Sequence, residues 1–335
     1  MKKILYALSI IFGGLFISCN NDLDLTADWK DIPVVYGILS INNSTHYLRI
    51  EKAFLDPATG AYELAKIPDS LYYADARVEL VRVSNGAVFP LTRVDGNLEG
   101  LVRDTGVFAN APNYLYKISN SQINLQGGEE MELRIYRGEN LPPATARTII
   151  LPQMDFQQNR PPGLISRWNQ QVPVRVGWRP NSDNAQIFDI EISMAYDETL
   201  PDMPGITNKT ITWKPFVNYP RPEGSSFVDA SIESDPFYQF VGSSIPVIPG
   251  AKRAFRGLTF TVIGGGREIY DFVNLTLAGS SSVTSAQDAP VYSNVDGGVG
   301  IFTSSSRVSQ SGVGLATEAR DSLIFGRYTK DLGFQ

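Results

Sequence analysis

Residues 172–178 read VPVRVGW, and residues 188–196 read FDIEISMAY. Apolar side chains take every second position of both stretches: Val172, Val174, Val176 and Trp178 in the first, and Phe188, Ile190, Ile192 and Met194 in the second. A period of two places such a row on one face of a β-strand. We therefore expect two strands, each with one face in a core and the other toward solvent.

The same pattern extends toward the N-terminus. Residues 33–41 and 46–54 flank the polar turn NNST, and residues 77–83 and 87–94 flank Ser-Asn-Gly. Residues 114–119 and 131–137 also alternate, with Gly-Gly between them. Short strands that recur every ten to fifteen residues with turns between them favour a β-sandwich over a parallel α/β sheet. The sequence therefore predicts a mainly β protein.

A change in the residue pattern near residue 150 predicts two domains. Residues 151–168, LPQMDFQQNRPPGLISRW, contain three prolines and little alternation, which is typical of a linker or a domain edge. We expect an immunoglobulin-like β-sandwich over 31–152 and a second β-rich domain over 153–335. The strands 172–178 and 188–196, joined by RPNSDNAQ, resemble the early strands of a fibronectin type III domain.

The second domain is expected to be an elaborated version of that fold. Residues 257–264 alternate like another strand, but 266–279, GREIYDFVNLTLAG, carry apolar residues at helical spacing, and Gly279 is suited to end a helix. The spacing predicts a helix near 267–278. Residues 321–328, DSLIFGRY, are expected to form a final strand.

The N-terminus has the features of a secretory leader. Lys2 and Lys3 precede a weakly polar or apolar run from Ile4 to Ile17. As a helix this run covers about 21 Å, less than the ~30 Å hydrocarbon core of a bilayer. A basic head, an apolar middle and a small residue before a cut indicate a signal peptide over residues 1–18.

Cys19, the only cysteine of the chain, directly follows this leader. The sequence FISC resembles the lipobox of bacterial lipoproteins, in which the cysteine is acylated and becomes the new N-terminus. Several acyl chains on one residue give stable membrane anchoring. We expect lipidation at Cys19, a tether over residues 19–30 and no disulfide. An ordinary signal peptide with an incidental cysteine is the alternative.

Charge restricts the partners. The formal net charge is −6, and removal of Lys2 and Lys3 leaves 27 basic against 35 acidic residues. This balance argues against nucleic acid and anionic lipid as partners. Asp22 and Asp24 are similar to the acidic tags that accompany surface display of lipoproteins, which favours the cell surface over the periplasmic face.

The residue types for catalysis are scarce. His46 is the only histidine, so any Ser-His-Asp system would have to use it, and the sequence contains no G-x-S-x-G elbow. The chain has too few His and Cys residues for a transition-metal site, and we expect no cofactor. A hydrolase with paired carboxylates remains an alternative, because the sequence does not show which acids face each other.

Exposed aromatic rings offer the main binding alternative. Trp168 and Trp213 lie in or near turn-rich and proline-rich stretches, where rings can stack on sugars or contact a partner protein. They are the candidate ligand-binding residues for a surface glycan-binding lipoprotein. For Gly297, Gly298 and Gly300 we favour a structural role in a tight backbone crossing over ligand binding.

Three stretches carry a family resemblance: PVVYGILSINNSTHYLRIEKAFL, YADARVELVRV, and REIYDFVNLTLAG followed by APVYSNVDGGVGIF. They resemble a Bacteroidota envelope lipoprotein family known as domain-of-unknown-function family 4249. The resemblance spans most of residues 30–305 and is most specific near the C-terminus. It implies an outer-membrane lipoprotein that neighbours nutrient-uptake systems, and it implies no activity.

Together these observations predict a non-catalytic lipoprotein of the outer membrane. It would act as an interaction or ligand-capture module, accessory to an uptake or export complex. Surface glycan binding is the alternative function, and a carboxylate-based hydrolase is the weaker one.

Overall fold

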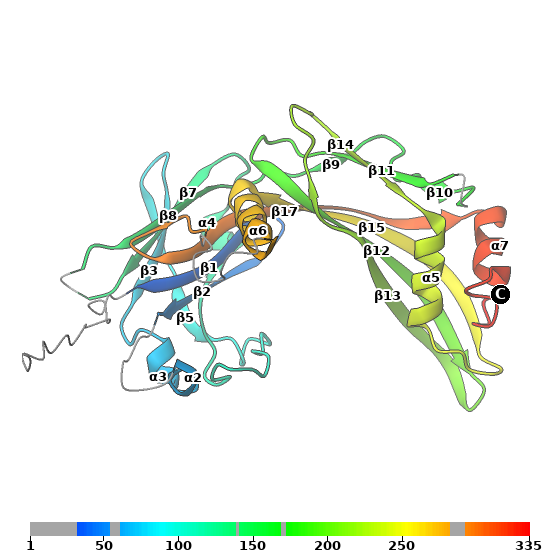
Figure 1. Ribbon diagram of the computed structural model, residues 1–335, viewed down its shortest axis with the longest axis horizontal. Helices are drawn as coiled ribbons and strands as arrows, with labels where there is room; N and C mark the ends of the chain where they lie inside the picture. Colours follow the sequence, from blue (N-terminus) through cyan, green and yellow to red (C-terminus); the bar gives the residue numbers. More distant parts are fainter. Residues whose placement is uncertain (1–31, 54–60, 139–140, 169–171, 282–291) are drawn as a thin grey trace, which may run out of the picture.

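The computed structural model describes residues 32–53, 61–138, 141–168, 172–281 and 292–335. The expected signal peptide (1–18), Cys19 and the tether (19–30) lie outside these residues. The described part is mainly β, as the alternating stretches predict, and it is built as two β-sandwich modules with separate apolar cores. Figure 1 shows the first module on the left and the second on the right. Within the described residues, no helix is long and apolar enough to cross a membrane.

The first module packs two sheets face to face. One contains β1 (Pro33–Ser40), β2 (Thr45–Lys52), β6 (Tyr114–Ser119) and β5 (Thr92–Asp95) in this order. The other has the order β16 (Val295–Asp296), β8 (Ala144–Ile149), β7 (Glu130–Tyr136), β3 (Arg77–Arg82) and β4 (Ala87–Pro90). The short helices α2 (Ala61–Leu64), α3 (Pro68–Leu71) and α4 (Asn120–Ile123) lie in the connections.

The expected strand 87–94 is divided between the two sheets. β4 ends at Pro90 and pairs with β3, whereas β5 begins at Thr92 and pairs with β6. The N–H of Leu91, between them, donates to the carbonyl of Val78. The chain therefore changes sheets at this point, which alternation within one stretch cannot reveal.

The second module places a long sheet opposite a short one. The long sheet contains β13 (Met203–Pro220), β12 (Ala185–Leu200), β15 (Lys252–Gly266) and β17 (Val299–Leu315), and β10 (Leu164–Ile165) pairs with β17. The short sheet has the order β14 (Val228–Ile232), β11 (Val174–Arg179) and β9 (Asp155–Phe156). Residues of α5 (Ser234–Ser244) and α7 (Thr317–Phe325) complete the second core.

The two stretches that indicate the fold lie in opposite layers of this module. β11 pairs with β14 and β9, whereas β12 pairs with β13 and β15. Their apolar faces meet in the core, where the rings of Trp178 and Phe188 pack edge to face with centroids 5.1 Å apart. The alternation thus identified two inner faces of one sandwich.

The expected final strand over 321–328 is wrong, because residues 317–325 form helix α7. Ala319 and Leu323 are its buried residues, and their spacing of four places both on one face of a helix. The polar residues between them are compatible with either element. Packing of Ala319 and Leu323 against the second core favours the helix over the expected strand.

β17 belongs to both modules. Its first half pairs in parallel with β1, from Val34 opposite Val299 to Ser40 opposite Ser305. Its second half pairs antiparallel with β15, as far as Val313 opposite Leu258. Phe302 is buried in the first core, and Val313 in the second. The sheets of the two modules therefore form one nine-stranded sheet.

This shared strand changes the predicted domain division. A boundary at residue 152 assigns everything after it to the second domain, but β16 and the first half of β17 complete the first module. The first sandwich thus needs a segment about 150 positions further along the chain. Strand pairing across such a separation leaves no local signal in the sequence.

Gly300 permits the parallel contact between β1 and β17. Its φ is +119°, and a Cβ at this position would lie 2.0 Å from the carbonyl oxygen of Val35. Gly298 is also confined, since a Cβ there would lie 2.9 Å from atoms of Pro33. These contacts fit the predicted structural role of the glycine signature.

Helix α6 (Arg267–Ser281) covers the expected helix at 267–278 and lies at the junction between the modules in Figure 1. Its first turn is fixed by Glu268, whose two carboxylate oxygens accept from the hydroxyls of Thr303 (2.9 Å) and Thr148 (3.2 Å). Burial raises the pKa of the Glu268 carboxyl. One side chain therefore connects α6 to β17 and β8.

We expect Gly300→Ala to destabilise the protein far more than Gly312→Ala on the same strand. Both glycines have a positive φ, but a Cβ at Gly312 meets nothing within 4 Å. The control should cost about 1–2 kcal/mol for its backbone conformation alone. Gly300→Ala should cost about 4 kcal/mol or more, because the clash separates β1 from β17. Urea unfolding measures both free energies, and equal values would contradict this account of the crossing.

Candidate functional site

The two tryptophans predicted as a stacking platform are core residues in the structure. Trp168 is 1% exposed, stacks on Phe237 with centroids 4.4 Å apart, and donates from Nε1 to the carbonyl of Ile232 at 2.9 Å. Trp213 is half-buried on β13, where Phe237 and Phe240 of α5 lie against its ring. The expectation of an exposed ring is therefore wrong at Trp168, and at Trp213 the ring is only partly exposed. The sequence around them is rich in turns, but packing under α5 hides their surfaces.

His46 is buried in the first module and faces no cavity described below. It is 1% exposed, and its Nε2 lies 3.4 Å from Oδ1 of Asn120. Nδ1 has no hydrogen-bond partner in the described part of the chain. Burial lowers the pKa of the imidazole below its ordinary value of 6.5. This is the environment of a neutral histidine in a core.

The acidic residues of the described ranges do not gather in a cleft. Each of three surface cavities contains a single carboxylate, from Asp69, Asp155 or Asp189. No group of three or more His, Cys, Asp or Glu side chains that could hold a metal ion is found in the described ranges.

Basic residues do gather, at the outer face of the short sheet. The net charge of the chain is negative, yet residues 156–182 contain four arginines and no acidic residue or lysine. These are Arg160, Arg167, Arg175 and Arg179. Sequence reasoning missed them, although a local charge count would have found the stretch. We call this group the arginine groove.

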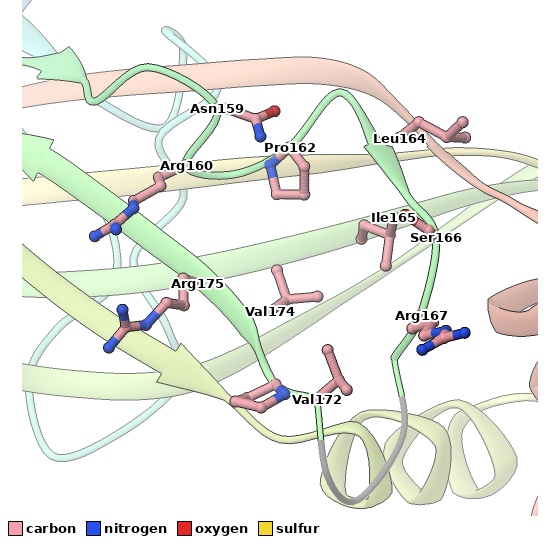
Figure 2. A pocket seen from close by; sticks show the side chains of 11 residues that line it. Asn159, Arg160, Pro162, Leu164, Ile165, Ser166, Arg167, Val172, Val174 and Arg175 are labelled. Carbon is pink, nitrogen blue, oxygen red and sulfur yellow. The ribbon is translucent and has the colours of Figure 1, made fainter.

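The first cavity of the arginine groove lies between β10 and β11 and has a volume of about 490 Å³. Figure 2 shows Arg160 and Arg175 extending to the same side of this cavity, with Arg167 at its opposite end. Its apolar lining includes Ile165 and Val174, which are buried, and Leu164, which is 58% exposed. The cavity therefore combines guanidinium groups with an apolar floor.

A second cavity of about 620 Å³ continues the groove along β11. Arg160 lines both cavities, and Arg179 and Asn181 line the second. Arg175 and Arg179 stand four residues apart on the outer face of the strand, with Gly177 between them. A Cβ on Gly177 would lie 3.2 Å from Cδ of Arg160, so Arg160 crosses the strand in the space that this glycine leaves.

The arginines differ in their pairing. Arg160 forms an ion pair with Asp229 of β14, and the exposed Arg167 pairs with Glu318 of α7 at 2.9 Å. Among the described residues, Arg175 and Arg179 form no ion pair. Their ten N–H donors face solvent or a ligand. A planar guanidinium pairs bidentately with a carboxylate, phosphate or sulfate group, so this face suits an anion.

The first module has a different cavity, of about 570 Å³, lined by aromatic rings. Tyr72 and Tyr114 pack edge to face with centroids 5.1 Å apart, and the guanidinium of Arg93 lies 4.2 Å from the centre of the Tyr114 ring. Lys52 and Asp69 also line this cavity. We call it the tyrosine cavity. Tyr72 is buried and Tyr114 is partly exposed, so Tyr114 is the ring of this pair that a ligand could contact.

Comparison with known proteins leaves the family open. No family model matches the chain, and no curated protein matches it. Among solved structures, the chain is similar to the crystal structure of chicken CNTN1 FN1–FN3 domains, at 10% identity and a TM-score of 0.18. That similarity covers 86% of this chain and 68% of the other. A TM-score this low supports no conclusion about this chain. None of the comparisons concerns family 4249, so membership in that family stays a prediction.

Acid should destabilise the first module through His46. The unfolded chain binds a proton on this imidazole more readily than the folded chain, because burial lowers the folded pKa. Stability therefore rises with pH between that lowered pKa and about 6.5, and falls on acidification through the same window. The contribution reaches about 1.4 kcal/mol per pH unit. Urea unfolding between pH 7 and 5 measures it.

His46→Leu, which keeps an apolar side chain in this place, is the control. It should flatten the part of the pH profile that lies below 6.5. An unchanged slope in this variant would assign the acid sensitivity to other groups.

Proposed function

We propose that this chain is a non-catalytic, lipid-anchored binding module of the outer membrane that captures an anionic ligand in its arginine groove. The observation that carries this proposal is the pair of guanidinium groups of Arg175 and Arg179, which form no ion pair among the described residues and lie beside Arg160 on one face of β11. Acylation of Cys19 would hold the chain to the bilayer. In this role the chain would serve an uptake or export complex.

The direction of the strands supports a binding role for the second module. β1 runs parallel to β17, and β17 leads from the first core into the second. Pro33, the first residue of β1, therefore lies at the end of this strand that is farther from the second module. An anchor that precedes Pro33 in the chain would leave the arginine groove on the module remote from the attachment point.

Local charge supports an anionic ligand even though the whole chain is acidic. Ion pairs between exposed groups are screened beyond about 8–10 Å at physiological ionic strength. A ligand in contact with Arg175 and Arg179 therefore responds mainly to these guanidinium groups.

Glycan binding in the tyrosine cavity is the second candidate function. Sugars stack on aromatic rings, and Tyr114 lines this cavity beside Tyr72 and Arg93. The cavity volume falls in the range of small-ligand sites, about 300–1,000 Å³. This candidate replaces the tryptophan platform, whose rings are occupied by α5 and the second core.

The anchor can be tested separately from the groove. In the native host, Cys19→Ser should move the protein from the membrane fraction to the soluble fraction, because no acyl chain can form on serine. Mass spectrometry of the wild-type protein should find a diacylglyceryl group on an N-terminal cysteine. A wild-type protein without this modification would refute the lipid anchor. Anion capture in the arginine groove would then be tested only by the binding experiment that follows.

The groove is tested by binding of polymers to soluble protein that begins after Cys19. We expect polyglutamate or polygalacturonate to bind, and the double variant Arg175→Gln/Arg179→Gln to weaken binding by about tenfold or more, since charge-assisted hydrogen bonds contribute about 1.5–3 kcal/mol each. Binding should also weaken as salt rises. Isothermal titration calorimetry in low and high salt measures both effects.

Lys209→Gln is the matched control, because it removes an exposed cation of the same module on β13, away from the groove. It should leave affinity unchanged. Failure of both polyanions to bind would refute the proposed function. Binding of neutral dextran that is lost in Tyr114→Ala and retained in the double arginine variant would support the second candidate instead.

A further inference from the structure

Among the residues that the structure describes, the backbone of β11 has an unpaired position beside the first cavity. The carbonyl of Gly177 accepts from the N–H of Gln157 at 2.8 Å, and its N–H donates to the carbonyl of Arg160 at 3.2 Å. Gly177 thus directs both backbone groups to the side of β9. Backbone groups alternate in direction along a strand, so those of Arg175 point to the same side. β9 pairs with only Trp178 and Arg179, so it does not reach Arg175.

The opposite side of the cavity is also formed by the edge of a strand, β10. β10 pairs in parallel with β17, and the carbonyls of Gly163 and Ile165 accept from the N–H groups of Gly314 and Ala316. By the same alternation, the backbone groups of Leu164 point away from β17. Leu164 and Arg175 both line the cavity. Within the described residues, the two short strands β9 and β10 therefore leave the edge of β11 unpaired at Arg175.

We propose that an extended acidic segment of a partner protein pairs with β11 at Arg175 and occupies the cavity between β10 and β11. This inference rests on the proposed function, because it names the partner of the arginine groove. The added strand would place alternate side chains beside the guanidinium groups of Arg175 and Arg160. The intervening side chains would face the apolar floor at Ile165 and Val174.

The spacing of the charges favours this geometry. Arg175 and Arg179 are four residues apart on a strand, which corresponds to about 13 Å. Arg160 lies over the position between them, above Gly177. Acidic residues at alternate positions of an extended peptide repeat at about 7 Å, so a peptide paired at Arg175 can direct a second acid toward Arg160. It cannot continue to Arg179, because β9 occupies that edge of β11. Main-chain hydrogen bonds would supply affinity and the alternating acids specificity, as in other strand additions.

The lining favours a peptide over an acidic polysaccharide. No aromatic ring is among the described residues that line the first cavity, so they offer a sugar no stacking surface. A polysaccharide also lacks the backbone N–H and C=O groups that an open strand edge binds. Leu164, 58% exposed, offers a contact that an apolar side chain can use.

The experiment uses three probes against the soluble protein that begins after Cys19. They are a peptide of alternating Glu and Val, the same peptide with N-methyl groups on alternate backbone amides, and polygalacturonate. We expect the unmodified peptide to bind and the N-methylated peptide to bind at least about fivefold more weakly, because the lost hydrogen bonds contribute about 0.5–1.5 kcal/mol each. The N-methyl series is made in both registers, so that one of them blocks the amides that face β11.

Amide hydrogen exchange locates the contact. The N–H of Arg175 should exchange more slowly by about tenfold or more in the peptide complex. The N–H of Lys209, on β13, serves as the control and should not change. Replacement of Glu by Gln in the peptide should abolish binding, and Arg175→Gln should weaken it.

The outcomes separate the two levels of the proposal. Peptide binding without protection of Arg175, or equal affinity of the N-methylated peptides, would overturn strand addition. Binding of polygalacturonate but not of the peptide would overturn the peptide partner and leave the proposed anion capture standing. Failure of every anionic probe would refute both.

Discussion

The parallel contact between β1 and β17 is the interaction on which the rest of the structure depends. It brings residues 299–305 into the first sandwich, and the same strand continues without interruption into the second. Because hydrogen-bonded strands keep a fixed register, the two modules cannot turn independently about a flexible linker. The absence of a side chain at Gly300 permits this contact. Glu268 adds a polar connection at the same junction through Thr303 and Thr148.

This continuity gives the second module a defined position relative to the start of the first. In the short sheet, β9 spans only two residues, which leaves the edge of β11 open at Arg175 among the described residues. Exposed strand edges are a hazard, since they can pair with another copy of the same chain. Positive side chains along β11 repel an identical strand and attract one with acidic residues, so the same arginines would prevent self-association and select a partner. The ion pair of Arg160 with Asp229 fixes one of these groups in place.

The aromatic residues illustrate how context changes the meaning of a residue type. Trp168 lies in a proline-rich stretch that reads as a linker, yet it is among the largest fully buried side chains of the described chain. Its indole N–H is satisfied by the carbonyl of Ile232, which burial of a polar group requires. Tyr72 and Tyr114, from stretches without a binding signature, line a cavity instead. Exposure depends on which element covers a residue, and here Phe240 of α5 lies against the ring of Trp213.

The sequence by itself determined the β class, most strand positions and helix α6, because each of these leaves a local periodic mark. For the glycines near residue 300 it favoured a structural role without deciding against ligand binding. Its N-terminal predictions concern residues outside the described ranges. The positive charge of residues 156–182 was also present in the sequence, but the sequence did not show that these arginines line one groove. Only the tertiary structure decided that β17 serves both cores, that residues 317–325 form a helix, that Trp168 is buried, and that three arginines align over one strand. These features arise from contacts between segments far apart in the chain, where burial and pairing outweigh local preference.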